Sequence, residues 1–103
     1  VLVRIIKDVW WPTVISANGD NLNDHFNVYG KRVRNVRLLQ IYDRWGSQVF
    51  SQTNLPDGNT NRSVGWSGDF KGKKALPGVY VFYAEVEYEG STGFEKEFSQ
   101  FII

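Results

Sequence analysis

The stretch from Val79 to Tyr88 constrains the fold most, because its side chains alternate in kind with a period of two. Such a period is that of a β-strand, whose successive side chains point to opposite faces. One face is apolar throughout, and the other starts apolar at Val79 and ends in glutamates. We therefore expect a strand that begins buried on both faces and ends exposed on one. Its apolar face comprises Tyr80, Phe82, Ala84, Val86 and Tyr88.

Two hairpins follow from the same kind of pattern. Val36 to Tyr42 is largely apolar on both faces, which is typical of a central strand. The turn residues Asp43 to Gly46 then lead into Gln48 to Phe50, which we expect to return as the second arm of a hairpin. A Gly-rich turn after residue 89 leads in the same way into the closing segment Phe94 to Ile103.

The remaining segments read as shorter strands and loops. We expect one interrupted strand or two short ones in residues 1–11, and a half-exposed strand at Phe26 to Tyr29. Ser51 to Gly65 reads as a long surface loop, and Leu76 to Gly78 as a type II turn. Tyr80 follows that turn and suits a tyrosine-corner residue.

No segment shows a helical period. About seven short strands are typical of an all-β fold, and we expect a single antiparallel Greek-key β-sandwich that is immunoglobulin-like. We expect one domain over residues 1–103, in which residues 1–10 serve either as a linker or as a strand from a preceding domain.

The composition of the chain argues against several classes of function. The chain has no Cys, which excludes disulfides and thiolate metal sites. The net charge of +1 provides no overall electrostatic case for nucleic acid or an anionic membrane, so local clusters matter more. No apolar run approaches the roughly 18 residues of a membrane span. His25 is the only histidine, and the chain lacks the nucleophile-elbow, P-loop, dinucleotide and zinc patterns, so we do not expect an enzyme.

The stretch from Ser16 to Asp24 holds five Asn or Asp residues within nine positions. Their side-chain oxygens can cap the backbone of their own loop, which is the ordinary role of such residues. The same oxygens can also ligate calcium, although only two carboxylates are available and no EF-hand pattern is present. The calcium ligands would be Asn18, Asp20, Asn23 and Asp24.

Several aromatic and charged residues have two interpretations. Trp45 and Trp66 can stack on sugar rings, but Trp beside Gly turns in a small β domain usually fills the core. Of Trp10 and Trp11, one is expected near the surface, because neighbouring strand residues face opposite sides. The basic segment reads as a solvated turn, or as a contact with an acidic partner or with lipopolysaccharide phosphate; it comprises Lys31, Arg32, Arg34 and Arg37. The acidic residues of the last two segments either protect a sheet edge, with cations opposite, or form a docking surface for a partner; they are Glu85, Glu87, Glu89, Glu95 and Glu97.

Three spaced motifs resemble one family. Asn18 to Asp24 is similar to the signature Asn-Gly-Asp-Gly-x-Asn-Asp, with Asn21 in place of its second Gly. Asp43 to Phe50 resembles an Arg-Trp-Gly-x-x-Val-Phe hairpin. Trp66 to Phe82 resembles a run of Trp-Asp-Gly, Gly-Lys and Leu-Pro-x-Gly-x-Tyr, with Ser67 in place of the Asp. The chain is thereby similar to the gliding-motility-associated C-terminal domain, the type B sorting domain of the type IX secretion system.

This resemblance implies a non-catalytic C-terminal module that directs a larger surface or secreted protein across the outer membrane. Its partners would be the secretion translocon, the shuttle proteins of that translocon and N-terminal cargo domains of the same chain. The motif residues are Gly19, Arg44, Trp45, Gly46, Trp66, Gly68, Pro77, Gly78 and Tyr80. Recognition by the translocon is expected at Phe94, Lys96, Phe98, Phe101, Ile102 and Ile103. The content of Trp and Tyr leaves open a carbohydrate-binding or adhesive β-sandwich.

Overall fold

A computed structural model describes residues 9–16, 24–61 and 63–103. These residues contain strands and no helix, which confirms the all-β class. In chain order the strands are β1 Val33–Asp43, β2 Gln48–Leu55, β3 Asp69–Phe70, β4 Lys73–Lys74, β5 Val79–Tyr88 and β6 Glu95–Ile102. Six strands are thus found in the described ranges, where about seven were expected over the whole chain. Within those ranges no helix has the length and apolarity needed to cross a membrane.

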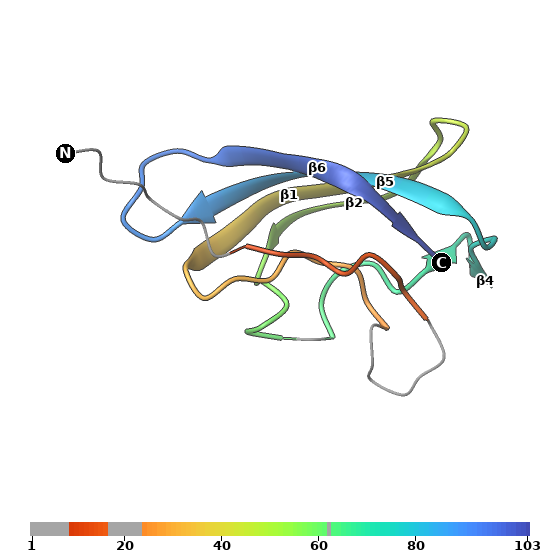
Figure 1. The fold of residues 1–103 in the computed structure, drawn as a ribbon, viewed down its shortest axis with the longest axis horizontal. Coiled ribbons are helices and arrows are strands. Elements are labelled where there is room, and N and C mark those ends of the chain that lie inside the picture. The colour runs from red at the N-terminus through yellow and green to blue at the C-terminus, as the bar shows by residue number, and fades with distance from the viewer. Residues whose placement is uncertain (1–8, 17–23, 62) are drawn as a thin grey trace.

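The main sheet is antiparallel and has the order β2-β1-β5-β6 (Figure 1). The two strands with the clearest apolar patterns, β1 and β5, occupy its centre. Their register places Val36 opposite Val86 and Ile41 opposite Phe82, so the apolar faces coincide. The β1–β2 and β5–β6 hairpins confirm the two pairings expected from the sequence.

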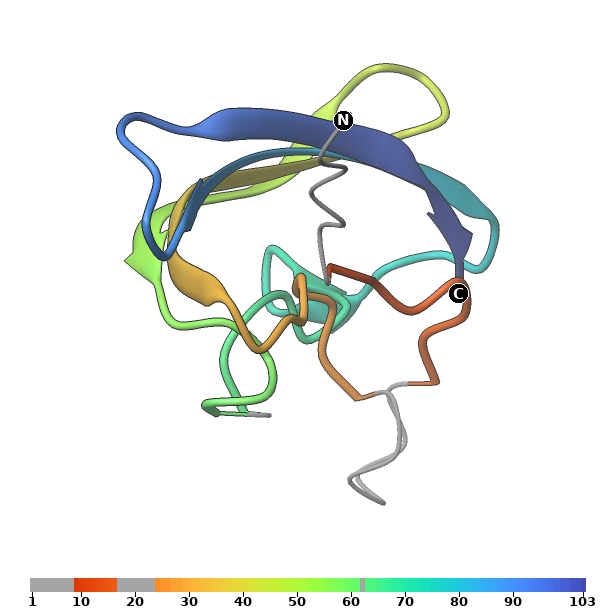
Figure 2. The same ribbon diagram turned by 60° about the vertical axis from the view of Figure 1, so that its left-hand side comes forward.

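One face of this sheet is covered by irregular segments before β1 and between β2 and β5 (Figure 2). They are tied by isolated bridges, at Trp10 with Tyr29, at Phe26 with Trp66 and at Val14 with Ile102. The expected half-exposed strand at 26–29 is therefore wrong: these residues are buried and touch their neighbours by single bridges. Of the expected N-terminal strands, residues 1–8 lie outside the described residues, and residues 9–11 form only a bridge.

Stacked aromatic rings join the covering segments to the sheet. The rings of Phe26 and Phe101 stack at 4.0 Å, and Phe26 also meets Phe82 at 4.8 Å. Trp11, from the N-terminal segment, contacts Phe82 edge-on at 5.0 Å. Since buried aromatic side chains contribute large apolar areas, this cluster is the centre of the core.

The segment from residue 51 to 65 does not form the expected surface loop. β2 continues to Leu55, and both Asp57 and Gly58 are buried. The Asp57 carboxylate accepts hydrogen bonds from the backbone N–H groups of Gly30 and Asn59, each at 3.1 Å. A Cβ on Gly58 would lie 2.3 Å from the Tyr29 ring, so the close packing there requires glycine. The turn residues Asp57 and Gly58 therefore pack and form hydrogen bonds inside the protein and do not face solvent.

The other face of the sheet lies away from the covering segments (Figure 2). Val79 and Val81 point to this outer face and are 41% and 42% exposed. The expectation that β5 begins buried on both faces is therefore wrong, because in the described structure the covering segments lie on the opposite face. We call this surface the outer face.

Candidate recognition site

The β1–β2 turn holds three motif residues, Arg44, Trp45 and Gly46, at one end of the molecule. Asp43 Oδ1 accepts hydrogen bonds from the backbone N–H groups of Trp45 and Ser47, both at 2.9 Å. Gly46 completes the turn with a φ of +82°. Trp45 is 77% exposed, and the Arg44 guanidinium lies 4.9 Å from its ring centre. The expectation that Trp45 fills the core is wrong, because the β1–β2 turn projects away from the covering segments (Figure 2).

The turn before β5 is held by Tyr80. Its hydroxyl donates a 2.5 Å hydrogen bond to the carbonyl of Leu76, as expected of a tyrosine-corner residue. Burial is the main factor that raises the pKa of Tyr80, and the nearby Asp43 raises it further, so the hydroxyl remains a donor at neutral pH. Gly78, next to Pro77, exchanges backbone hydrogen bonds with Ile103 at 3.1 and 3.3 Å. The turn and the last residue of the chain are thus fixed together.

Trp66 anchors the same end from inside. It is 2% exposed, and its indole Nε1 donates to the carbonyl of Asp69 at 2.9 Å. Its ring meets Tyr80 at 5.3 Å and Phe101 at 6.1 Å, which confirms its core role. Gly68 has a φ of +83°, and its carbonyl accepts the N–H of Ala75 at 2.7 Å. These contacts position the β3–β4 hairpin beside the turn at Tyr80.

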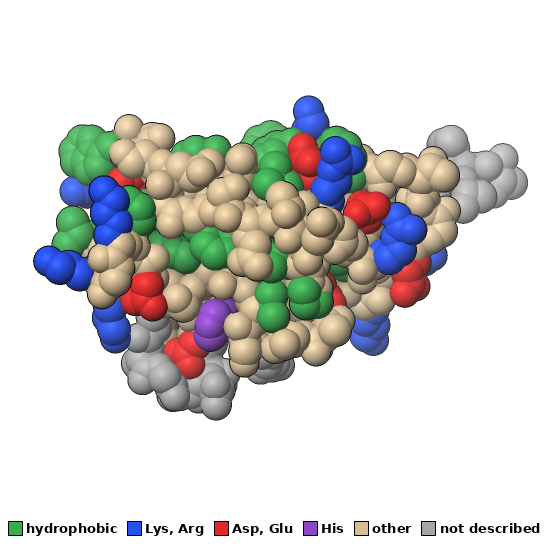
Figure 3. All heavy atoms as spheres, turned by 180° about the vertical axis from the view of Figure 1, so that it is seen from behind, with side chains coloured by type: hydrophobic (Ala, Val, Ile, Leu, Met, Phe, Trp, Pro, Cys, Tyr) green, Lys and Arg blue, Asp and Glu red, His purple; other side chains and the backbone are tan. Residues whose placement is uncertain are grey.

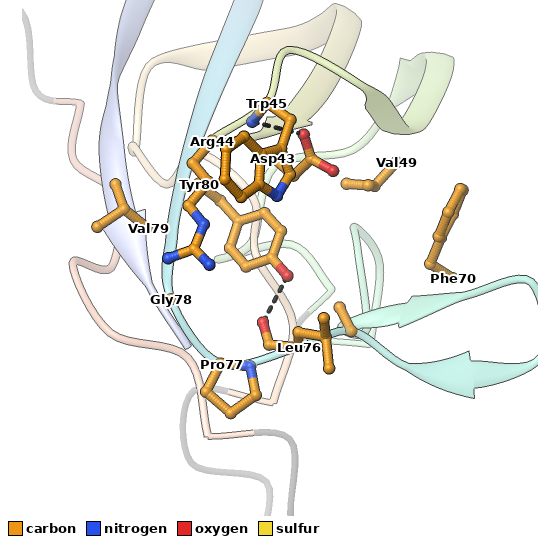
Figure 4. Close-up of a pocket in the computed structure, with 11 residues that line it drawn as sticks. Asp43, Arg44, Trp45, Val49, Phe70, Leu76, Pro77, Gly78, Val79 and Tyr80 are labelled. Atoms are coloured by element: carbon orange, nitrogen blue, oxygen red, sulfur yellow. Dashed lines mark hydrogen bonds between the residues drawn. The ribbon is translucent and has the colours of Figure 1, made fainter.

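A pocket of about 230 Å³ lies between these turns (Figure 4). Five of the motif residues line it: Arg44, Trp45, Pro77, Gly78 and Tyr80. The sequence analysis did not assign the other lining residues to a site; among them Phe70 and Leu76 are exposed apolar residues, and Leu76 precedes the proline of a turn that the sequence did indicate. The remaining lining residues are Asp43, Val49, Ala75 and Val79. A second pocket of about 440 Å³ lies beside Lys74, Leu76 and Ile103.

The last strand, β6, forms one edge of the main sheet. Ile103 pairs with Gly78, so by strand alternation Phe101, Ser99 and Glu97 also direct their backbone groups toward β5. The backbone groups of the alternate residues point away from the sheet. At Ile102 they meet the segment before β1, where Ile102 N–H donates to Thr13 and Ile102 C=O accepts from Ile15. The residues whose backbone groups face the open edge are Lys96, Phe98 and Gln100.

The predicted recognition residues of the terminal segment separate onto two faces. Phe101 is 1% exposed and packs in the core, whereas Phe98 is 75% exposed on the outer face. Ile102 is 45% exposed, and Lys96 is exposed beside Phe98. Phe94 is half-buried, with the Arg37 guanidinium 4.2 Å from its ring centre. The exposed set is therefore Lys96, Phe98 and Ile102.

Ion pairs cross the outer face between β1 and β5. Arg34 binds Glu87 at 2.8 Å, and Arg37 lies 3.4 Å from Glu85. A hydrogen bond from Asn35 at 2.8 Å is the largest factor that lowers the pKa of Glu87. The expectation that the glutamates face cations is confirmed for Glu85 and Glu87, and the charge of Arg34 and Arg37, half of the basic segment, is thereby balanced.

Most of the Asn- and Asp-rich loop lies outside the residues that the structure describes. Asn18, Gly19, Asp20 and Asn23 lie outside the described residues, and Asp24 is half-buried. Among residues 9–16, 24–61 and 63–103, no group of three acidic or histidine side chains is arranged to hold a metal. Calcium binding therefore stays a prediction.

Two buried polar residues were not predicted from the sequence. Asn27 Nδ2 donates to the carbonyl of Pro56 at 2.9 Å, and its Oδ1 accepts the N–H of Val28. Asp57 joins the same region to the turn before β1, because its carboxylate accepts the backbone N–H of Gly30. Asn27 alternates with apolar residues as a solvent-facing residue would, so its pattern alone did not reveal its burial.

An exposed sheet edge such as that of β6 can accept an added strand from a binding partner. The chain is a member of the CHU_C type IX secretion signal domain family, whose family model matches residues 9–102. Comparison with curated proteins and with solved structures found no match. Family membership confirms the resemblance seen in the motifs and implies a sorting role through the type IX secretion machinery, with export across the outer membrane toward the cell surface or beyond.

Proposed function

We propose that this chain is a non-catalytic C-terminal sorting module that directs a larger surface or secreted protein through the type IX translocon. The observation that carries the proposal is the family match over residues 9–102. The module acts as one domain over residues 1–103, with an immunoglobulin-like Greek-key arrangement and with residues 1–10 as the connection to the cargo. Its partners are the outer-membrane translocon, the shuttle proteins of the translocon and the cargo domains of the same chain.

We assign recognition to the open edge of β6. Lys96, Phe98 and Gln100 offer their backbone N–H and C=O groups to an added strand of the partner. The exposed ring of Phe98 supplies an apolar contact beside that strand. Main-chain bonds supply affinity and alternate side chains supply specificity in this mode of binding. Phe101 and Ile103 serve the site indirectly, because they fix β6 to the core and to Gly78.

Proline substitution tests this assignment in export assays. Gln100→Pro removes an N–H that faces the open edge, whereas Ser51→Pro does the same on the opposite edge strand, β2. A fluorescent reporter is fused ahead of the domain in a host that has the translocon, and the surface-exposed reporter is measured. We expect loss of export with Gln100→Pro and unchanged export with Ser51→Pro. Equal export of both variants would remove the edge assignment, and no export of the parent fusion would remove the sorting function.

Calcium binding at the loop of Asn18, Asp20, Asn23 and Asp24 is a separate proposal. It rests on four oxygen-bearing side chains at short spacing. We expect millimolar calcium to raise the melting temperature of the parent chain, and Asp20→Ala to abolish the rise. An unchanged melting curve contradicts the proposal.

The carbohydrate-binding alternative is supported by one observation, the 77% exposure of Trp45. A stacking platform needs an accessible ring face, and here the Arg44 guanidinium lies 4.9 Å from the ring centre. We therefore rank it second. Glycan binding by the isolated domain that is lost in Trp45→Ala, together with failed export, would reverse the order.

A further inference from the structure

Exposed apolar and cationic side chains alternate at the end of the molecule that carries the β1–β2 turn, the β3–β4 hairpin and the turn before β5. Trp45 and Leu76 are 77% and 78% exposed, and Phe70 is 36% exposed. The Arg44 guanidinium lies 4.9 Å from the Trp45 ring centre, and Lys71 Nζ lies 5.2 Å from that of Phe70. Figure 3 shows Lys and Arg side chains gathered with hydrophobic ones at the left of the view, the end where β4 lies. We call Arg44, Trp45, Phe70, Lys71, Lys73 and Leu76 the apical cluster.

The local backbone supports a role for this surface beyond packing. The β3–β4 turn has positive φ at both central residues, +54° at Lys71 and +78° at Gly72. Turns of this type favour Asn, Asp or Gly at the first of these positions. A lysine there occupies a conformation that is uncommon for its type, and the turn places its ammonium beside Phe70 at the tip of the hairpin.

Among the described residues, the cations of the apical cluster are compensated less closely than the arginines of the outer face. On the outer face Arg34 and Arg37 are paired with Glu87 and Glu85. Around the apical cluster, Asp43 Oδ1 is engaged by two backbone N–H groups. Asp69 accepts a hydrogen bond from the Ser67 hydroxyl at 3.0 Å. In the part of the chain that the structure describes, these two carboxylates stand beside the three cations of the apical cluster, Arg44, Lys71 and Lys73, so the cluster itself has an excess of positive charge.

We propose that the apical cluster docks the domain on an anionic lipid surface. Trp, Phe and Leu at the tips of separate turns can enter the headgroup region of a bilayer. A bilayer is fluid, so its surface does not have to be complementary in shape to the protein. The flanking cations stay at headgroup level, where each Lys or Arg contributes attraction to anionic lipids. This docking goes beyond the sorting role and does not depend on it.

Binding to vesicles tests the proposal with the 103-residue chain. The probes are vesicles of phosphatidylcholine mixed with phosphatidylglycerol, and vesicles of phosphatidylcholine alone as the neutral reference. We expect sedimentation with the anionic vesicles only, weakened by added salt. Trp45 fluorescence should shift to the blue on binding, and Trp45→Phe should lose most of that shift while it still binds.

Charge-matched variants locate the surface. The triple variant Arg44→Gln, Lys71→Gln and Lys73→Gln should bind anionic vesicles about 100-fold more weakly, at roughly fivefold per cation. The control, Lys31→Gln, Arg32→Gln and Arg34→Gln, removes the same charge elsewhere and should bind like the parent. Melting curves of both variants establish that they fold. Trp45→Ser with Leu76→Ser should also weaken binding, because it removes the inserted apolar groups.

Three results would overturn the proposal. The first is no binding to anionic vesicles at low salt. The second is equal weakening by the two triple variants, which would reduce the effect to net charge. The third is binding of a polyglutamate peptide that depends on the apical cluster without any affinity for vesicles, which would assign the surface to an acidic protein.

Discussion

The two edge strands of the main sheet, β2 and β6, differ in regularity. β2 carries a register shift opposite Ile41 and Tyr42, and Asn54 near its end has a φ of +56°. Exposed polar side chains line most of its length. β6 keeps an unbroken register with β5 over eight residue pairs, and it exposes Phe98. Bulges and polar side chains discourage strand addition, so β2 is a protected edge and β6 a receptive one.

The two edge strands also differ in how deeply their inward side chains are buried in the core. The inward residues of β6 include Phe101, whose ring stacks on Phe26 at 4.0 Å. The inward residues of β2 include Phe50, which is only half-buried, and Gln52, which is exposed. β6 is thus open along its backbone and firmly held by its inner side chains. A strand of this kind can accept a partner without losing its place in the fold.

The largest expected effect tests this anchoring. Phe101→Ala removes a fully buried ring and should lower the free energy of unfolding by about 3–5 kcal/mol. Phe50→Ala, the counterpart on β2, should cost about 1–2 kcal/mol because that ring is half-buried. Urea denaturation followed by circular dichroism measures both. Equal costs would contradict the contrast between the two edges.

A second effect tests the orientation of the β6 backbone. Ser99→Pro removes an N–H that we assign to the ladder with β5, and it should cost about 3 kcal/mol or more. Gln100→Pro removes an outward N–H and should cost less than about 1 kcal/mol. Ser99→Ala controls for the loss of the side chain. If the two prolines had reversed effects on the melting temperature, the open edge would be formed by the other set of residues.

The smallest expected effect concerns the outer face between the two edges. The pKa of Glu87 is lowered, first by the hydrogen bond from Asn35, relative to its ordinary value of 4.5. A lowered folded-state pKa adds stability above the unfolded-state pKa, and this stability is lost as the pH falls through the folded-state value. We therefore expect a small drop in melting temperature below about pH 4.5. Asn35→Ala should raise the pKa of Glu87, as measured by NMR titration, and an unchanged pKa would contradict the assigned cause.

Period and turn chemistry were enough to predict the central part of the fold. β5 and β1 were located by their apolar patterns, and the two hairpins by the turn residues between them. Trp66 was correctly placed in the core, and Tyr80 was correctly assigned to its turn. These predictions succeeded because each depends on contacts within a strand or across a short turn.

The errors fall where burial depends on distant segments. Residues 26–29 read as a half-exposed strand, yet they are buried because the segments before β1 and after β2 close over the sheet. Trp45 read as a core residue, yet its turn projects away from those segments (Figure 2). Asp57 read as a loop residue, yet it binds the backbone at Gly30, far from it in sequence. No local pattern encodes which face of a sheet is covered.

The amino-acid order alone therefore determined the all-β class, the central strands and the family motifs, because these depend on local alternation and on the backbone preferences of Gly, Pro, Asn and Asp. Only the tertiary structure decided that motif residues far apart in the chain meet around one pocket. It also decided that β6 lies at an edge, and that the apical cluster joins three separate turns. Such placements arise from long-range packing, in which the solvent exposure of a residue depends on segments that its own neighbours do not specify.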